Sequence, residues 1–326
     1  MSKYSLEIST AIEAIRVASQ LCQRIRNELT ENTSIQKGDR TPVTVADYGA
    51  QAIICKMIRE RFPKDSIVAE EDSKELRNPT HSNILEQVTH FVNLFIPNSS
   101  PQEICSWIDF SSNLITDRFW TLDPIDGTKG FMRGDQYAIA LALIENGVIQ
   151  LGFLACPNLY VVKDQPDGER GCLFFSIRGK GAFQMDMDGG RREVLSVSTI
   201  EDPKEALLTE SVEPDHADHL THQRVARLLN IQKTPLKIDS QAKYGLVARG
   251  EATFYLRVPS PSEPDYKEKI WDHAAGSIIV EGAGGRVTDI TGNPLDFSCG
   301  IRLEKNRGIL VSNGMIHDLI LKVLKM

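Results

Sequence analysis

The segment TLDPIDGTKGF, residues 121–131, holds two carboxylates three residues apart, at Asp123 and Asp126, around Pro124. Because proline fixes the backbone φ and turns the chain, both carboxylates can point to one side, with the carbonyl of Ile125 beside them. Two carboxylates this close repel each other and lose hydration when buried, so the pattern favours a cation between them. The alternative is an ordinary exposed turn, because Asp-Pro-x-Asp-Gly is a good turn sequence by itself.

Further acids follow other apolar segments. Glu70 and Glu71 follow the apolar residues of DSIVAEED, which is typical of a short strand that runs into acids, and Asp272 follows Trp271 at the predicted start of a helix. Taken singly, the glutamates are typical of a solvated strand end and Asp272 of a helix cap. Together with the first pair they form an oxygen-only ligand set, which suits hard cations and above all Mg²⁺. Two such ions can bind a phosphoryl oxygen and activate water, so the set predicts phosphoester hydrolysis.

Two small residues, Gly127 and Thr128, follow the first acid pair directly. Small residues at the start of a helix expose backbone N–H groups, which form an anion site. We therefore expect a phosphate group to bind beside the carboxylates.

The overall composition limits the classes of function. The chain has 326 residues, 41% apolar and 25% charged, with a formal net charge of −7. This length fits one large domain or two ordinary ones. No basic stripe is present, which disfavours a protein that coats nucleic acid, although a small anionic ligand is compatible with bound cations. We expect a small-molecule substrate and no nucleic-acid partner.

The cysteines and the N-terminus indicate a cytoplasmic protein. The N-terminal MSKYSLEIST lacks the apolar core of a secretory signal, and no apolar run reaches the ~18 residues of a membrane span. The cysteines form no C-x-x-C pair and no zinc spacing, so they predict buried free thiols in a reducing compartment. They occupy positions 22, 55, 105, 156, 172 and 299.

The expected elements place these motifs at ends of strands and helices. Apolar residues at steps of three and four predict long helices over 8–29 and 50–62 and another over 84–95. The last lies in an insertion-like region, 76–118. Asn146-Gly147, between two apolar runs, predicts a hairpin. The stretch MDMDGGRRE, near 186–193, is the best candidate for a boundary between a domain of residues 1–190 and a domain of residues 191–326.

Two long motifs carry a resemblance to a known family. WTLDPIDGTKGF and WDHAAGSIIVEGAGGRVTD resemble the two signatures of the inositol monophosphatase superfamily of magnesium-dependent, lithium-sensitive phosphatases. Their order after the acid pair at 70–71 also matches, and the resemblance covers nearly the whole chain. It implies a layered α/β/α/β/α sandwich, in which the first domain is α+β with a large, mostly antiparallel sheet and the second is α/β.

Within the superfamily, three segments are similar to the 3'(2'),5'-bisphosphate nucleotidases. They are GDRTPVTVADYGAQ, GTKGFMRGDQYAIALALIENG and DSQAKYGLVARGEATFYLR. The likeness implies hydrolysis of the 3'-phosphate of adenosine 3',5'-bisphosphate, and of the sulfated analogue 3'-phosphoadenylyl sulfate, by a monomer or weak homodimer. Other open activities are hydrolysis of inositol 1,4-bisphosphate, inositol 1-phosphate or fructose 1,6-bisphosphate. A nucleotide or metal sensor on the same scaffold is the alternative without catalysis.

The resemblance also implies a role for each matching acid. One Mg²⁺ would bind Glu70, Asp123 and the Ile125 carbonyl, and a second would bind Asp123, Asp126 and Asp272. A third ion near Glu70 is possible in this family, and Glu71 would contribute through water.

Catalysis and substrate binding are implied for a second group of residues. Thr128 would orient the attacking water and Asp47 would accept its proton, whereas the simpler use of Asp47 is as a helix N-cap. Backbone N–H groups of Gly127 and Thr128 would hold the scissile phosphate. The remaining substrate contacts implied by the family pattern are His216, Ser240, Lys243, Arg257 and Asp272. Lys243 and Arg257 suit the second phosphate because they are cationic.

Overall fold

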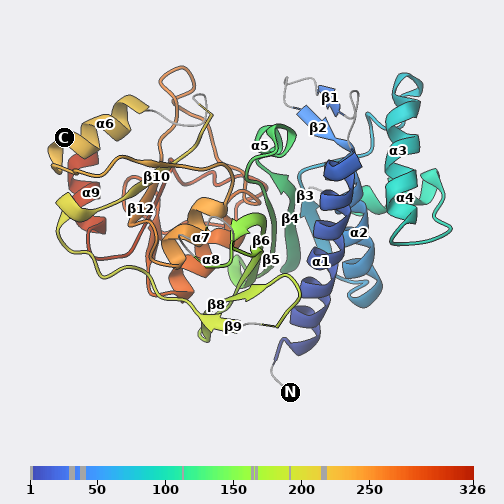
Figure 1. Cartoon of the computed structure of the whole chain (residues 1–326), viewed down its shortest axis with the longest axis horizontal. Coiled ribbons are helices and arrows are strands. Elements are labelled where there is room, and N and C mark those ends of the chain that lie inside the picture. Colours follow the sequence, from blue (N-terminus) through green and yellow to red (C-terminus); the bar gives the residue numbers. More distant parts are fainter. Residues whose placement is uncertain are drawn as a thin grey trace.

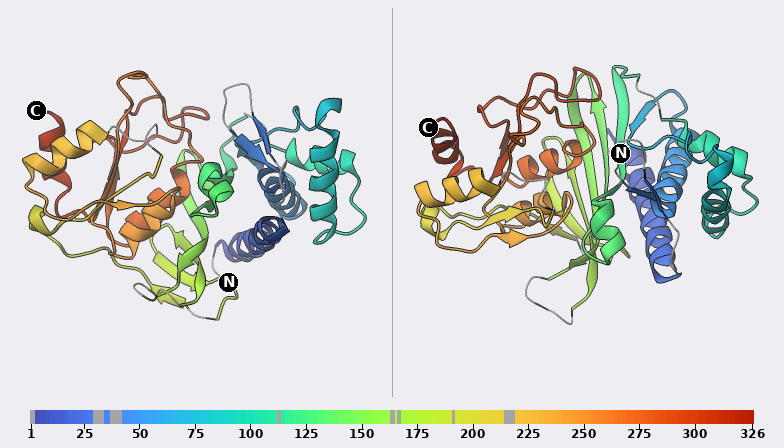
Figure 2. Two further views of the ribbon diagram at one scale, coloured as in Figure 1. Left: turned by 45° about the horizontal axis from the view of Figure 1, so that its top comes forward. Right: turned by 90° about the horizontal axis from the view of Figure 1, so that it is seen from above.

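The computed structural model describes residues 3–28, 34–36, 42–111, 114–162, 165, 168–190, 192–213 and 219–326. Two sheets and three layers of helices alternate across it, as Figure 1 and both views of Figure 2 show. The order is outer helices, a large sheet, inner helices, a smaller sheet and a second outer layer of helices. The layered sandwich expected from the sequence is therefore confirmed.

The large sheet has seven strands in chain order within the described residues, and it is antiparallel except for the parallel pair β3 and β4. Asn146 and Gly147 have φ of 50° and 75°, the left-handed conformation that a tight hairpin turn requires, and they join β5 to β6 as predicted. The strands are β3 (Ser66–Ala69), β4 (Arg118–Asp126), β5 (Ala138–Glu145), β6 (Val148–Tyr160), β7 (Arg170–Ile177), β8 (Gly181–Asp186) and β9 (Arg192–Val194).

Both faces of the large sheet are apolar, because helices cover both. Neighbouring residues of β6 show this: Phe153 belongs to the core under the outer helices and Leu154 to the core under the inner helices. The outer helices are α1 (Ser5–Glu28) and α2 (Val45–Arg61), and the inner ones are α7 (Ala242–Ala248) and α8 (Ala274–Gly282). The expected helix over 8–29 is found as far as residue 28, and residue 29 lies outside the described residues.

The smaller sheet has five strands within the described residues, in the order β11-β10-β12-β14-β13. Helices α6 (His219–Leu228) and α9 (His317–Leu324) cover its face away from α7 and α8. Its strands are β10 (Leu208–Glu210), β11 (Leu236–Lys237), β12 (Phe254–Arg257), β13 (Arg286–Thr288) and β14 (Ile309–Ser312). Strands β10, β11 and β12 are parallel, and β12, β14 and β13 are antiparallel.

The insertion-like region forms a small helical layer beside α2. It contains α3 (Ser82–Asn93) and α4 (Pro101–Ile108), whose apolar residues join the core that α1 and α2 share. A β-ribbon of β1 (Ser34–Gln36) and β2 (Pro42–Thr44) precedes α2. The division of the chain after residue 190 stays a prediction; strand β9, just beyond it, pairs with β8 of the large sheet.

The rest of the backbone adds short elements. Helix α5 (Thr128–Arg133) follows β4 directly, and two 3-10 turns span Pro79–His81 and Pro203–Glu205. Within the described residues, no helix is both long and apolar enough to cross a membrane.

Candidate active site

The end of β4 carries the first acid pair in an irregular stretch of strand. Asp123 lies opposite Ala140 of β5 and Asp126 opposite Ala138, so three residues of one strand advance against two of the other. The Asp123 side chain accepts a hydrogen bond from the Ile125 N–H at 3.1 Å and is 2% exposed. The turn predicted at Pro124 is thus a distortion of the strand that holds a carboxylate inside the protein.

Glu70 joins this pair because β3 runs parallel to β4. Ala69 is paired with Leu122, and the Glu70 N–H donates to the Leu122 carbonyl at 3.2 Å. Burial raises the pKa of Asp123 well above its usual value, and Glu70, Asp126 and Asp272 raise it further. Acids that are far apart in the sequence therefore converge at one edge of the large sheet.

Asp272 approaches from the second half of the chain, just before α8. Burial raises its pKa well above the usual value, and Asp126 adds to the effect, although Arg257 acts in the opposite direction. The simpler use of Asp272 as a helix cap is wrong, because the N-cap of α8 is His273 and has no side-chain capping bond. Its carboxylate is thus available to the cluster.

The four acids, Glu70, Asp123, Asp126 and Asp272, have the properties of a divalent-cation site. The raised pKa values of Asp123 and Asp272 show that the charges oppose one another, which a bound cation would relieve. Asp123 is buried, Asp126 and Asp272 are partly exposed, and Glu70 is exposed, so the cluster opens towards solvent. The side-chain atoms that could bind a metal here are all oxygens, which Mg²⁺ prefers as ligands. The residues present therefore fit Mg²⁺.

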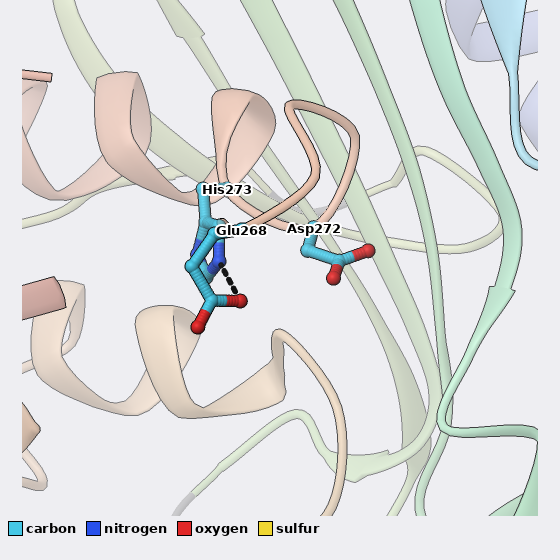
Figure 3. Close-up of side chains that lie close together, drawn as sticks. All are labelled: Glu268, Asp272 and His273. Atoms are coloured by element: carbon cyan, nitrogen blue, oxygen red, sulfur yellow. Dashed lines mark hydrogen bonds and ion pairs between the residues drawn. The ribbon is translucent and has the colours of Figure 1, made fainter. Parts of the chain in front are cut away.

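A second group beside Asp272 does not have this character (Figure 3). Single ligand atoms of Glu268, Asp272 and His273 lie within 4.8 Å of one another. However, Glu268 already accepts a hydrogen bond from the Arg257 Nε at 2.8 Å and pairs with the His273 Nε2 at 3.2 Å. The two oxygens of Glu268 are therefore occupied, and Figure 3 shows Asp272 pointing away from this pair.

The group around Glu268 holds Arg257 in place. Burial raises the pKa of Glu268, but Arg257 and His273 together outweigh burial and lower this pKa to about 2. On its other ring nitrogen, His273 lies 2.7 Å from the hydroxyl of Tyr244. A Cβ atom at Gly276 would lie 2.3 Å from the Tyr244 ring, so α8 packs closely against this tyrosine. The sequence did not predict that Glu268, His273 and Tyr244 contact one another. The one indication in the sequence was the pair Asp272-His273 after Trp271.

Asp47 lies at the N-terminus of α2 and is fully buried. It is not the N-cap, as the simpler interpretation had it. Thr44 is the cap, and Asp47 completes the capping box by accepting the Thr44 N–H at 2.8 Å and the Thr44 hydroxyl at 2.5 Å. The other carboxylate oxygen of Asp47 lies 3.2 Å from the Thr128 hydroxyl. The pair predicted from the family pattern is therefore in hydrogen-bond contact across 81 residues of chain.

Thr128 is the first residue of α5, and Gly127 is its N-cap with φ of 88°. A side chain at Gly127 would be strained in this conformation and would place its Cβ 3.1 Å from that of Ser240. The helix start predicted here is confirmed. Its backbone lies next to Asp126, between the first acid pair and the segment that carries Ser240.

The residues expected to contact a nucleotide lie on the inner layer and on β12. Ser240 has φ of 67° and is 7% exposed, and the N–H of the following Gln241 donates to Asp126 at 2.6 Å. Lys243, on α7, is 4% exposed, and burial lowers its pKa to about 8 although Asp126 acts in the opposite direction. Both cations, Lys243 and Arg257, are thus held close to the acids. His216 lies outside the described residues.

Ion pairs connect α5 to the smaller sheet. Arg133 binds Asp239 and Glu213, and Lys129 also binds Glu213 at 3.3 Å. A Cβ at Gly130 would lie 2.9 Å from the Asp239 carboxylate. These contacts hold the helix that begins at Thr128 against the segment that precedes Ser240.

The chain matches the model of the inositol monophosphatase family over residues 4–325. A protein of Oryza sativa named 3'(2'),5'-bisphosphate nucleotidase is 42% identical, over 99% of this chain and 94% of that protein. One of Dictyostelium discoideum with the same name is also 42% identical, over 97% and 96%. The Schizosaccharomyces pombe protein of this name is 39% identical, over 98% and 95%.

Solved structures agree on the fold. The Thermotoga maritima IMPase is 24% identical, with a TM-score of 0.68 over 98% of this chain and 96% of that one. An inositol monophosphatase from Anabaena is 22% identical, with a TM-score of 0.62 over 99% and 97%. The match to the family model and the similarity to the three nucleotidases both extend over nearly all of the sequence, and the protein is therefore a member of the inositol monophosphatase family.

Proposed function

We propose that this protein hydrolyses the 3'-phosphate of adenosine 3',5'-bisphosphate, releasing AMP and phosphate, and that Mg²⁺ is its cofactor. The observation that carries the proposal is the full-length similarity, 39–42% identical, to proteins named for this activity. The buried Lys243 and the partly buried Arg257 beside the four-acid cluster support it, because a bisphosphate needs positive groups for the phosphate that does not react.

The four acids would hold the cation, with the Ile125 carbonyl as a further ligand. When bound, Mg²⁺ supplies positive charge that stabilises the phosphoryl oxygens and makes water more acidic. Two ions fit the expectation from the family pattern, in which Asp123 contributes to both.

Thr128 and Asp47 would move the proton. Water would attack phosphorus in line and give up a proton, while the bond from phosphorus to the 3'-oxygen breaks and that oxygen takes up a proton from solvent to become the 3'-hydroxyl of AMP. The Thr128 hydroxyl, which lies 3.2 Å from Asp47, would accept that proton while passing its own to the carboxylate. One oxygen of Asp47 accepts both bonds from Thr44, and the other oxygen faces the Thr128 hydroxyl.

The second phosphate and the nucleoside would bind beyond the acids. Lys243 donates from its Nζ to the Ile238 carbonyl at 3.2 Å, and Arg257 is oriented by Glu268. Both would contact the 5'-phosphate, with Ser240 and His216 contributing to nucleotide binding. The same arrangement would accept 3'-phosphoadenylyl sulfate, and Li⁺ would inhibit by replacing one Mg²⁺.

The direct test is phosphate release from adenosine 3',5'-bisphosphate with Mg²⁺, with EDTA, and with increasing Li⁺. We expect turnover that EDTA abolishes and Li⁺ inhibits. The panel includes 3'-phosphoadenylyl sulfate, inositol 1,4-bisphosphate, inositol 1-phosphate and fructose 1,6-bisphosphate. A higher kcat/KM for an inositol or sugar phosphate than for the nucleotide would contradict the proposed substrate, and turnover in EDTA would contradict the metal.

A further inference from the structure

A cavity of about 420 Å³ lies in the second half of the chain, at the outer layer of helices. Its walls come from α6, from the loop that follows β12, and from the end of α9. Three cations line it, Arg224, Arg307 and Lys325, together with the apolar rings of Pro259 and Pro261. Its volume falls in the range of pockets that bind small molecules, roughly 300–1,000 Å³.

This cavity lies on the opposite face of the smaller sheet from the acid cluster. Successive side chains of a strand point to opposite faces. On β12, Tyr255 packs against Tyr244 and belongs to the core on the acid side, whereas Leu256 belongs to the core under α6 and α9. Arg257 then points to Glu268, and Val258, the next residue, lines the cavity. The cavity is thus separate from the candidate active site.

The charges in the cavity are not balanced by the protein. Its lining includes no acid; Glu263 and Asp265, on the adjoining loop, are not part of it. Among the described residues, the side chains of Arg224, Arg307 and Lys325 form no ion pair with any acid.

One donor in the cavity wall is also unsatisfied. The Nε of Arg224 is buried and has no hydrogen-bond acceptor in the described structure. Buried donors are normally satisfied, and leaving one unpaired is unfavourable, although Arg16 and Arg249 each have an unpaired Nε as well. The C-terminal end of α9 lies at the cavity and carries a partial negative charge of about half a unit. The three full positive charges of Arg224, Arg307 and Lys325 are larger than this partial charge.

We propose that this cavity binds a small organic molecule that carries a phosphate or sulfate group. Arginine suits such anions because its planar guanidinium can donate two parallel hydrogen bonds, and Lys325 adds charge. The wall of Pro259, Pro261 and Val258 would contact the apolar part of the ligand. Phosphate and sulfate present the same tetrahedral oxygens, so the cavity chemistry is common to both.

The test is calorimetric titration of the full chain in EDTA at constant ionic strength, with inorganic phosphate, sulfate and AMP as separate probes. EDTA removes the cations that would let the acid cluster bind an anion. Because Lys243 and Arg257 would hold a 5'-phosphate in the candidate active site, AMP is also titrated into the Lys243→Met variant, where binding in the cavity is expected to persist. We expect saturable binding of at least one probe. Tighter binding of AMP than of phosphate would assign the apolar wall to the organic part of the ligand.

Variants separate specific binding from general charge. Arg224→Gln and Arg307→Gln are each expected to weaken binding at least tenfold. Arg227→Gln removes the same charge from an exposed position on α6 outside the cavity and is expected to bind as wild type does. Arg307 is exposed, so its variant keeps the test valid even if Arg224→Gln unfolds. Absence of saturable binding by wild type, or equal loss in Arg227→Gln, would overturn the proposal.

Discussion

Replacing Thr128 by valine tests the proton path most directly. Valine has nearly the shape of threonine but lacks the hydroxyl that lies 3.2 Å from Asp47 and 3.2 Å from the Ile125 carbonyl. Asp47 keeps both bonds to Thr44, at 2.8 and 2.5 Å, so its position is preserved. The substitution therefore removes the proposed relay and little else.

The expected size of the effect follows from those contacts. Loss of one partly exposed hydroxyl bond changes the free energy of unfolding by about 1 kcal/mol, whereas loss of positioned proton transfer lowers the rate by roughly 10²–10⁴-fold. We therefore expect kcat to fall at least a hundredfold, with KM within about threefold of wild type. Steady-state phosphate release with Mg²⁺ measures both parameters.

Serine at position 128 is the matched control, because it retains the hydroxyl and removes only the methyl group. We expect Thr128→Ser to keep kcat within about tenfold of wild type. Should Thr128→Val turn over as fast as Thr128→Ser, the hydroxyl does not transfer the proton and the relay to Asp47 is wrong. Thermal unfolding of both variants checks that neither has lost its fold.

The remaining predictions concern charge. Asp123→Asn should abolish turnover. In EDTA, however, the variant should have a Tm roughly 2–4 °C above that of wild type, because the substitution removes a buried carboxylate that its neighbours repel. Scanning calorimetry with and without Mg²⁺ measures this difference, and a lower Tm of the variant in EDTA would contradict the prediction. Lys243→Met should raise KM for the bisphosphate about tenfold or more and leave any hydrolysis of inositol 1-phosphate unchanged; equal losses on both substrates would argue against a role in binding the second phosphate. Burial lowers the pKa of His317 to about 4, below its unfolded value of about 6.5, so its contribution to stability is complete above pH 6.5 and is lost as pH falls towards 4. The free energy of unfolding, measured in urea, should therefore fall less between pH 6.5 and pH 4 in His317→Gln than in wild type, by up to about 3 kcal/mol. An equal fall in both proteins would contradict the lowered pKa of His317.

The neutral state of His317 also follows from its two hydroxyl partners. The Thr288 hydroxyl donates to the Asp289 carbonyl at 2.7 Å, so it accepts from the His317 Nε2 at 2.9 Å. The other nitrogen is then the acceptor for Ser312, at 2.8 Å. A second proton on the ring would require Ser312 to give up this donation, which supports the direction of the pKa shift.

The sequence predicted the elements that carry strong local signals. Asn146-Gly147 specifies its turn because both residues adopt positive φ readily. The acid pair at Asp123 and Asp126 was found because proline and glycine between apolar strand and helix leave few conformations. Glu70 and Asp272 were singled out as acids at a strand end and at a predicted helix start. Their separate places in the ligand set came from the family pattern, since no local rule brings a strand end and a helix start together.

Other features of the site could not be predicted because they depend on tertiary contacts of single residues. Thr44 looked like one more polar residue in a loop, but it caps α2 and fixes Asp47. Glu268 lies a few residues before the motif that begins at Trp271, yet its role comes from its contact with Arg257 at the end of strand β12. Such pairs have no periodicity, so neither helix nor strand patterns reveal them.

The pairing of Glu268 with Arg257 explains how one site can hold four acids and still bind an anion. A free arginine beside Asp272 would pair with that carboxylate and compete with a metal ion for it. Burial lowers the pKa of Arg257, but Glu268 and other acidic groups around it, Asp272 among them, together raise this pKa, and Glu268 holds the guanidinium by its Nε. The outer edge of the guanidinium can then donate to a phosphate, while the carboxylates remain for cations. Separate placement of positive side chains and of the proposed metal ligands would thus let an acidic protein bind the proposed substrate with its two phosphates.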